Sequence, residues 1–152
     1  MINPFSLPKT IPASILNNPK NAPVALVDLD RTLCDNNRFY VPADLSEYLQ
    51  DKPHPVIYPI IQKLIEEKLP LVIISCRPKS ALFHSRQWLS ANNIFPLLIL
   101  HRADDDLRED WIIKQEMMLT RVFPAMYIKI AFDDKVSIRE MYQKYGINCF
   151  YF

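Results

Sequence analysis

The fold of this chain is decided by the stretch VALVDLDRT, residues 24–32. Its first four residues are apolar and include two β-branched valines, which is typical of a short strand buried on both faces of a parallel sheet. The carboxylates Asp28 and Asp30 follow directly. We therefore predict the central strand of an α/β domain here, with acidic side chains at its carboxyl end.

Outward from this strand, apolar strand-like runs alternate with segments of helical periodicity. Further strands are predicted over residues 69–75, 96–100, 126–134 and 147–152. Helices are predicted over residues 45–49, 56–68, 79–93, 105–123 and 136–145, the last of them closed by Gly146. Strands that alternate with helices form parallel sheets covered by helices on both faces. The expected fold is therefore α/β, a three-layer α/β/α sandwich around a mostly parallel, Rossmann-like sheet.

The composition indicates one soluble domain. A chain of 152 residues that is 49% hydrophobic and 23% charged can bury a single packed core. Residues 1–23 contain five prolines and little periodicity, so we expect a proline-rich N-terminal arm there and the folded domain over residues 24–152. The sequence shows no membrane span or signal segment, and its three cysteines are too few for a disulfide framework. We expect a cytoplasmic protein without membrane contact.

Charge and glycine content exclude several classes of function. The formal net charge is +1, so any affinity for nucleic acid has to come from a local basic patch. Gly146 is the only glycine, and neither the GxGxxG fingerprint nor a P-loop can be built without more of them. A Rossmann dinucleotide site and a P-loop kinase are therefore excluded.

Polar side chains gather where the predicted strands end. They are Asp28 and Asp30 after the first strand, Ser75 and Arg77 after the second, Asp133 and Asp134 after the fourth, and Lys114 on the helix over 105–123. The carboxyl ends of parallel strands meet at one edge of a sheet, so we expect these side chains to converge there. Four carboxylates in one place repel one another unless a divalent cation neutralises them. Mg²⁺ is the cofactor we expect.

In this order the residues resemble the motifs of the haloacid dehalogenase superfamily of aspartate-dependent phosphohydrolases. DLDRT, residues 28–32, is similar to the superfamily's DxDx[TV] motif. VIIS ends at Ser75 as the second motif does, Lys114 corresponds to the third, and FDD ends at Asp134 like the acidic pair of the fourth. The resemblance covers nearly the whole chain and implies the superfamily's fold and its phosphatase activity.

Within that superfamily the chain most resembles the 3′-phosphatase domain of polynucleotide kinase/phosphatase enzymes, particularly the phage type. The similarity lies in the spacing of the second and third motifs of that family, which is matched by Ser75, Arg77, Arg102, Asp110 and Lys114. Arg38 lies near a substrate-contacting arginine in the family's loop after the first motif. The kinase half of those enzymes has no counterpart here.

Two residues depart from the family's pattern. Arg31 stands where the family usually has Gly, and its side chain can point outward. Cys76 replaces the Gly of the second motif and places a larger group near the phosphate pocket. The change at Cys76 bears on substrate fit more than on the chemistry, whereas position 31 is variable across the superfamily.

The resemblance implies a role for each matched residue. Asp28 is the nucleophile that forms an aspartyl-phosphate, and Asp30 is the general acid and then the general base. Phosphate is held by Ser75 and Lys114, and substrate is contacted by Arg38, Arg77 and Arg102, with Asp110 orienting Lys114 or Arg102. The implied ligands of Mg²⁺ are Asp28, the main-chain carbonyl of Asp30, water, and the pair Asp133 and Asp134, and the sequence leaves open which acid of this pair contacts the metal.

The class of substrate can be inferred from the length of chain that is available for a cap domain. The two intervals that hold caps in this superfamily, here residues 33–70 and 76–113, are too short for a large lid, so an open site is expected. An open site admits a polymer end, and Arg38, Phe39 and Tyr40 could steer and stack a nucleic-acid strand.

Three hypotheses about function remain open. The first is removal of 3′-phosphates from DNA or RNA ends. The second is a phosphatase of nucleotides, other small phosphomonoesters or phosphoproteins. The third is a catalytically silent binding module. The sequence also leaves open whether a separate kinase or ligase is a partner.

Overall fold

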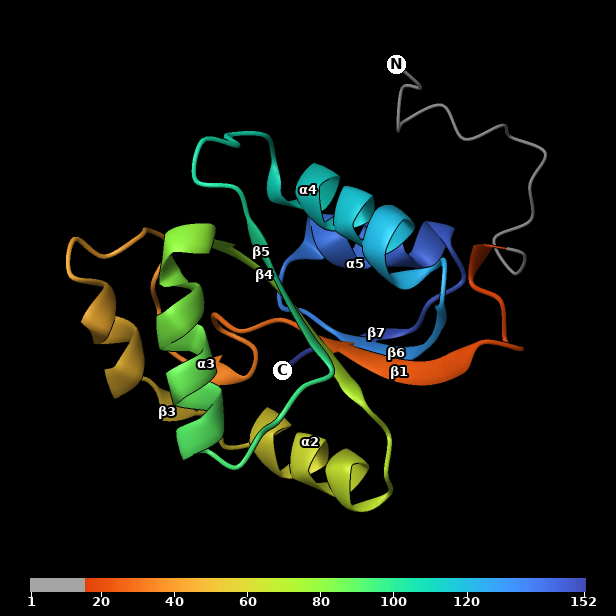
Figure 1. Ribbon diagram of the computed structural model, residues 1–152, viewed down its shortest axis with the longest axis horizontal. Coiled ribbons are helices and arrows are strands. Elements are labelled where there is room, and N and C mark those ends of the chain that lie inside the picture. The colour runs from red at the N-terminus through yellow and green to blue at the C-terminus, as the bar shows by residue number, and fades with distance from the viewer. Residues whose placement is uncertain (1–15) are drawn as a thin grey trace.

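The computed structural model describes residues 16–152 and shows a parallel sheet covered by helices on both faces (Figure 1). The five strands lie in the order β5-β4-β1-β6-β7. Their bounds are Ala22–Val27 (β1), Leu71–Pro78 (β4), Leu98–Arg102 (β5), Met126–Phe132 (β6) and Cys149–Phe150 (β7). All four neighbouring pairs are parallel. The predicted central strand is the middle strand of this sheet, and the predicted α/β fold is confirmed.

Four α-helices connect the strands. Their bounds are Ile57–Glu66 (α2), Leu82–Ala91 (α3), Asp110–Met117 (α4) and Val136–Lys144 (α5). Short turns extend two of them: the 3₁₀ turn η2 (Lys79–Ala81) precedes α3, and the π-helical turn η3 (Met118–Val122) follows α4. The helix predicted over 105–123 begins at Asp110, because residues 105–109 lie in a turn and irregular loop before it. The strand predicted over 147–152 is shorter, spanning only β7.

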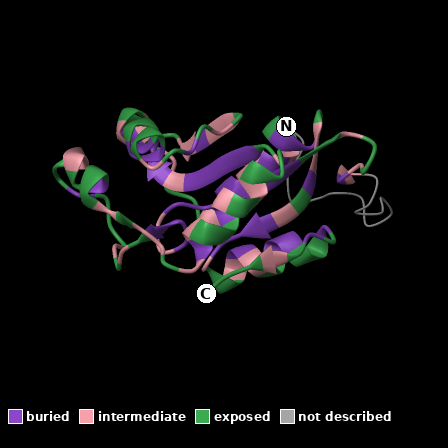
Figure 2. Ribbon diagram, turned by 90° about the horizontal axis from the view of Figure 1, so that it is seen from below, coloured by how far each residue is buried: buried purple, intermediate pink, exposed green. Residues whose placement is uncertain are grey.

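The core lies on both faces of the sheet. Val24 and Leu26 of β1 pack in one cluster with residues of η3 and α5. Ala25 and Val27 point the other way and pack with residues of α2 and α3. Successive strand residues face opposite sides, so an uninterrupted apolar run is what a strand covered on both faces requires. Figure 2 shows these buried strands between helices whose outer faces are exposed.

Gly146 ends α5 as predicted. Its φ of +71° lies in the left-handed region, which glycine adopts without steric cost. The backbone N–H of Gly146 donates to the carbonyl of Gln143, and the N–H of Ile147 donates to that of Tyr142. These two bonds satisfy carbonyls that the helix end leaves free, and they turn the chain toward β7.

The predicted N-terminal arm lies mostly outside the described residues, since 1–15 are not described. Its described end is bound to the domain. The Asn17 amide donates to the carbonyl of Ile128 at 2.9 Å, and the Ile128 N–H donates to Asn17 Oδ1 at 2.7 Å. The strand β1 begins at Ala22, two residues before the predicted boundary. Residues 22 and 23 therefore belong to the sheet, and the division into arm and domain otherwise stays a prediction.

The segment between β1 and α2 is small and leaves the carboxyl edge of the sheet without a large cap. It contains an antiparallel pair of two-residue strands, β2 (Cys34–Asp35) and β3 (Lys52–Pro53), and the 3₁₀ helix η1 (Leu45–Gln50) between them. Within residues 16–152, every helix falls short of the length and apolar character that a membrane span needs.

Candidate active site

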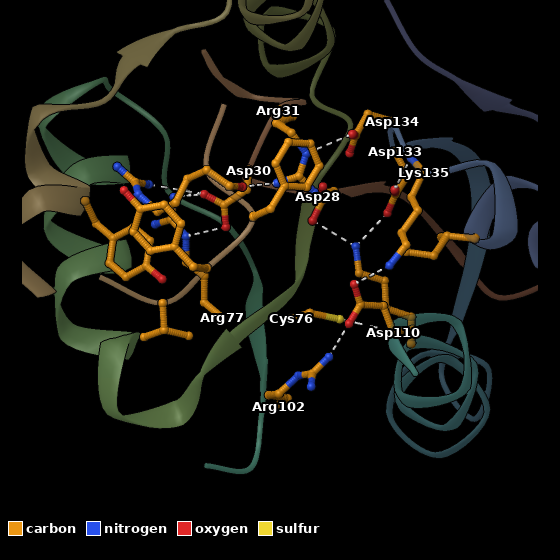
Figure 3. A pocket seen from close by; sticks show the side chains of 17 residues that line it. Asp28, Asp30, Arg31, Cys76, Arg77, Arg102, Asp110, Asp133, Asp134 and Lys135 are labelled. Carbon is orange, nitrogen blue, oxygen red and sulfur yellow. Dashed lines mark hydrogen bonds and ion pairs between the residues drawn. The ribbon is translucent and has the colours of Figure 1, made fainter. Parts of the chain in front are cut away.

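Most of the predicted site residues line one cavity at the carboxyl edge of the sheet (Figure 3). The cavity has a volume of about 310 Å³. The predicted residues in its lining are Asp28, Asp30, Arg38, Arg77, Arg102, Asp110, Lys114, Asp133 and Asp134. Ser75 is the one predicted site residue that does not belong to the lining.

A buried lysine lies between two carboxylates at the centre of the site. Lys114 projects from α4 and donates from Nζ to Asp28 Oδ1 at 2.8 Å and to Asp133 Oδ2 at 2.6 Å. Burial raises the pKa of Asp28 to about 7, while the Lys114 charge acts in the opposite direction. Burial lowers the pKa of Lys114, but the charges of Asp133 and Asp28 outweigh it and raise this pKa well above its usual value. Lys114 is therefore a fixed counter-charge for Asp28.

Three carboxylates form a candidate metal site beside this lysine. One ligand oxygen from each of Asp28, Asp133 and Asp134 can be chosen so that all lie within 4.8 Å of one another. Burial and the Asp28 charge raise the pKa of Asp134, while its ion pair with Arg31 acts in the opposite direction. Hard carboxylate oxygens are the ligands that Mg²⁺ and similar divalent cations prefer. The donor set therefore fits a divalent cation, and the side chain of Asp30 is not part of it.

The Asp30 side chain turns instead toward Arg77 on β4. Arg77 donates from Nε to Asp30 Oδ2 at 3.0 Å and from Nη2 to Oδ1 at 2.9 Å. Asn36 donates to Oδ1 at 3.0 Å. Burial raises the pKa of Asp30, but the hydrogen bonds and charge of Arg77 outweigh burial and hold this pKa below its usual value. Asp30 is thus a carboxylate here, and Arg77 is committed to it.

The sequence did not indicate Asp51 as a site residue. Its carboxylate binds Arg38 and Arg77, the two arginines that also pair with Asp30. Arg38 donates to its two carboxylate oxygens at 2.8 and 3.0 Å, and Arg77 Nη2 donates to Oδ2 at 3.2 Å. The Tyr48 ring lies 3.9 Å from the Arg77 guanidinium carbon and 4.8 Å from that of Arg38. Nothing in the sequence marks Asp51 or Tyr48, because they follow no strand and belong to no motif.

Arg31 also takes a place that the sequence did not indicate. Its side chain points into the site rather than outward, donating from Nε to Asp134 Oδ2 at 3.1 Å and from Nη1 to the carbonyl of Arg38. The guanidinium carbon lies 4.1 Å from the centre of the Phe39 ring. The residue that departs from the family's glycine is therefore part of the cavity wall.

The opposite rim is organised by Asp110 at the start of α4. Arg102 donates to Asp110 Oδ1, and Lys135 donates to Oδ2 at 2.9 Å. Burial raises the pKa of Asp110, but Lys135 and Arg102 outweigh it and hold this pKa below its usual value. We expected Asp110 to orient either Lys114 or Arg102. Its carboxylate accepts a hydrogen bond from Arg102. Lys135 joins this rim although no sequence motif singles it out.

The second motif lies partly beneath the surface of the cavity. Ser75 is buried, and its hydroxyl oxygen accepts a hydrogen bond from the Arg77 backbone N–H at 3.1 Å. Cys76 does line the cavity, as expected from the loss of the family's glycine. Burial raises the pKa of the Cys76 thiol to about 11, so this group is neutral near pH 7.

Comparison with known families identifies this arrangement. Residues 22–152 match the model of the polynucleotide kinase PNKP phosphatase domain. The chain belongs to this family. It is therefore a phosphatase domain of the haloacid dehalogenase type, as the order of its motifs predicted.

Two solved structures share the fold of this PNKP phosphatase domain. A chain in the structure of the Pnkp1/Rnl/Hen1 RNA repair complex is 22% identical with a TM-score of 0.81, and the match covers 90% of this chain and 44% of that chain. A chain in a structure of the Pnkp1/Rnl/Hen1 complex is also 22% identical with a TM-score of 0.81, covering 97% of this chain and 51% of that one. This chain therefore spans about half the length of those relatives.

The cavity of this PNKP phosphatase domain separates two kinds of carboxylate. Asp28 lies beside a fixed ammonium and two further acids, where a cation and a phosphate can meet. Asp30 lies two residues away on an arginine pair, outside the acidic trio. Such a division of environment between neighbouring acids is a common basis for assigning them different chemical roles.

Proposed function

We propose that this domain removes 3′-phosphates from nucleic-acid ends through an aspartyl-phosphate intermediate. The observation that carries the proposal is the pair Asp28 and Lys114, at 2.8 Å, at the carboxyl end of the central strand and in the wall of an open cavity. A buried carboxylate with a fixed cation beside it is a nucleophile whose approach to a phosphate dianion is electrostatically assisted.

Mg²⁺ is the cofactor proposed for the acidic trio. Asp28, Asp133 and Asp134 would hold it, together with the main-chain carbonyl of Asp30. When bound, the cation supplies neutralisation of the phosphate oxygens and of the repulsion among the acids. Lys114 already balances part of this charge through its ion pairs with Asp28 and Asp133.

In the first step an Asp28 carboxylate oxygen forms a bond to phosphorus while the bond from phosphorus to the leaving oxygen breaks. Asp30, which takes up a proton from solvent as the substrate binds, gives that proton to the leaving oxygen, so the strand leaves with a 3′-hydroxyl. Because Arg77 holds the Asp30 pKa low in the free domain, proton donation requires that an incoming phosphate weaken this pair.

In the second step water attacks phosphorus and the bond to Asp28 breaks, which regenerates the carboxylate and releases inorganic phosphate. Asp30 accepts the proton of that water. Its two hydrogen bonds from Arg77 favour the carboxylate form that this step needs. When Asp28 regains its negative charge, the Lys114 ammonium balances it without moving, because Lys114 is buried on α4.

The cationic side chains that line the cavity are proposed to bind the phosphate and the nucleic-acid strand. Lys114 is proposed to contact phosphate directly. Ser75 is proposed to donate its hydroxyl hydrogen to phosphate, because its oxygen already accepts the Arg77 backbone N–H and its O–H is free to donate. Arg102, held by Asp110, and Arg38, held by Asp51, both line the cavity and are proposed to contact the nucleotide backbone. Arg77 acts mainly through Asp30.

A nucleic-acid end as substrate is supported by three observations. The carboxyl edge carries no large cap, the family is that of PNKP phosphatase domains, and solved relatives of the same fold belong to an RNA repair complex. Substrate and cytoplasmic location are part of the proposal, as is action alongside a kinase or ligase supplied by another chain.

The test is release of inorganic phosphate from four substrates, with Mg²⁺ or with EDTA. The substrates are a 3′-phosphorylated oligonucleotide, its 5′-phosphorylated isomer, a 3′-nucleoside monophosphate and glycerol phosphate. We expect Mg²⁺-dependent release that is selective for the 3′-phosphorylated oligonucleotide and absent in Asp28→Asn. Equal rates on all four substrates would point to a general phosphomonoesterase, and no release from any of them would contradict the proposal.

A further inference from the structure

An exposed apolar edge borders the cavity on the side of the loop after β2. Phe39, Tyr40 and Val41 line the cavity and are 81%, 69% and 54% exposed. Large apolar side chains at such exposure are costly to solvate when they gather at one place, and a group of them beside a binding cavity marks a contact surface.

Phe39 is held in place from beneath by Arg31. The guanidinium carbon of Arg31 lies 4.1 Å from the centre of the ring, and its Nη1 donates to the carbonyl of Arg38, the residue before Phe39. Its Nε is bound at the same time to Asp134 Oδ2 at 3.1 Å. The side chain of Arg31 thus ties the loop to the acidic cluster, and the other face of the Phe39 ring stays open to solvent.

The backbone at Arg31 supports a dedicated role for this tie. Its φ is +59°, a left-handed conformation that a residue with a Cβ adopts at a cost of roughly 1 kcal/mol. Glycine would avoid the cost but would leave Asp134 without its 3.1 Å ion pair and Phe39 without the cation beneath it.

We propose that the open face of Phe39 is the stacking surface for the terminal nucleobase of the substrate, and that Arg31 is the positioning residue that holds it at the cavity mouth. The inference rests on the proposed function, because a nucleobase is presented only if the phosphate is carried by a nucleotide. It adds a binding site for the base, separate from the groups that bind phosphate.

The chemistry of the pair favours a flat aromatic ligand. A base that stacks on Phe39 covers the exposed ring, and the guanidinium on the far side adds a cation–π contact to the stack. Nothing in the contacts of the ring reads a base by hydrogen bonding, so the surface accepts any base and grips the strand end without sequence preference.

The test compares two 3′-phosphorylated trinucleotides at saturating Mg²⁺, one complete and one whose 3′-terminal residue lacks its base. In the unmodified protein we expect loss of the base to raise KM by about tenfold. Phe39→Ala should raise KM for the complete trinucleotide by a similar factor and leave KM for the abasic one unchanged, with kcat preserved in both. Phe39→Trp should restore the low KM.

Phe83→Ala is the matched control, because Phe83 is an exposed phenylalanine on α3 that does not line the cavity. Arg31→Gly and Arg31→Lys test the positioning role. The lysine keeps a positive charge near Asp134 but loses the flat guanidinium. Each should raise KM for the complete trinucleotide by a larger factor than KM for the abasic one, because Arg31 also pairs with Asp134, and adding Phe39→Ala to either should have little further effect on that difference.

Each outcome decides one of the two proposals. If Phe39→Ala changes neither KM, or changes both by the same factor, the stacking surface is wrong while removal of 3′-phosphates stands. If Arg31 and Phe39 variants act independently, the positioning role is wrong. If the unmodified protein releases no phosphate from the complete trinucleotide but does so from glycerol phosphate, the proposed function fails, and the nucleobase surface fails with it.

Discussion

Arg77 and Asp30 form a two-point ion pair between β4 and the end of β1, with Nε to Oδ2 at 3.0 Å and Nη2 to Oδ1 at 2.9 Å. The Arg77 side chain has no exposed surface, so its charge depends entirely on the carboxylates around it. The same guanidinium donates to the hydroxyl of Ser85 at 3.2 Å and lies against the Tyr48 ring. One residue therefore joins a proposed catalytic acid to the packing of two other elements.

Arg77→Lys is expected to cost about 3 kcal/mol of unfolding free energy, because an ammonium cannot make the paired contacts and leaves a buried carboxylate poorly matched. Urea unfolding measures this cost. The turnover number should also fall. Arg86→Lys, at an exposed position on α3, is the control and should leave both quantities unchanged.

Asp51→Asn is expected to lower kcat/KM by about tenfold, although Asp51 does not line the cavity. The neutral amide keeps the shape but loses the charge that holds Arg38 and Arg77, and hydrogen bonds to charged groups contribute roughly 1.5–3 kcal/mol. Steady-state kinetics on the 3′-phosphorylated oligonucleotide measures the effect. The exposed neighbour Asp35→Asn should behave like the unmodified protein, and an equal loss in both variants would contradict a specific role for Asp51.

Mg²⁺ is expected to raise the melting temperature by about 8 °C at a concentration one hundred times its dissociation constant, relative to EDTA. Binding relieves the repulsion among Asp28, Asp133 and Asp134 in the folded state only. Differential scanning fluorimetry measures the shift. It should shrink in Asp134→Asn and persist in Asp105→Asn, which changes an exposed acid away from the cluster. An undiminished shift in Asp134→Asn would place the cation elsewhere.

The Cys76 thiol is expected to react slowly with iodoacetamide at pH 7.5, and the rate should rise about tenfold per pH unit up to its pKa of about 11. Burial raises this pKa, so only a minor fraction is thiolate at neutral pH. Mass spectrometry of the labelled chain measures the rate at this residue. Rapid labelling at neutral pH would mean that the thiol is less shielded than the structure shows.

The positions of the strand-end residues could be predicted because parallel topology determines them. Once the apolar runs ending at Val27 and Phe132 are assigned to neighbouring parallel strands, the acids that follow them have to meet at one edge. The same argument brings Arg77 close to Asp30, because β4 also pairs with β1. This prediction needs only the apolar pattern of the strands and the order of strands and helices along the chain.

The side chains of the loop after β1 could not be predicted in this way. Asp51 reaches the site because the small β2–β3 pair folds back, and no apolar periodicity describes that segment. The direction of Arg31 depends on a left-handed backbone and on a carboxylate more than one hundred residues away in the chain. Ser75 was placed on the correct strand, but its hydroxyl orientation follows from a local bond to Arg77. Such contacts are properties of the assembled site.

The central position of β1 also has a consequence for motion. Its backbone is hydrogen-bonded to β4 on one side and β6 on the other, so its amide protons should exchange with solvent only when the whole domain unfolds. The loop that carries Phe39 belongs to no strand pair and is held by side chains, Arg31 and Asn36, so its amide protons should exchange faster than those of β1. Asp28 thus directly follows a strand that is paired on both sides, whereas the proposed base-stacking residue lies on a loop outside the sheet. The nucleophile and the proposed stacking residue can therefore differ in backbone stability although both lie in the segment from 28 to 39.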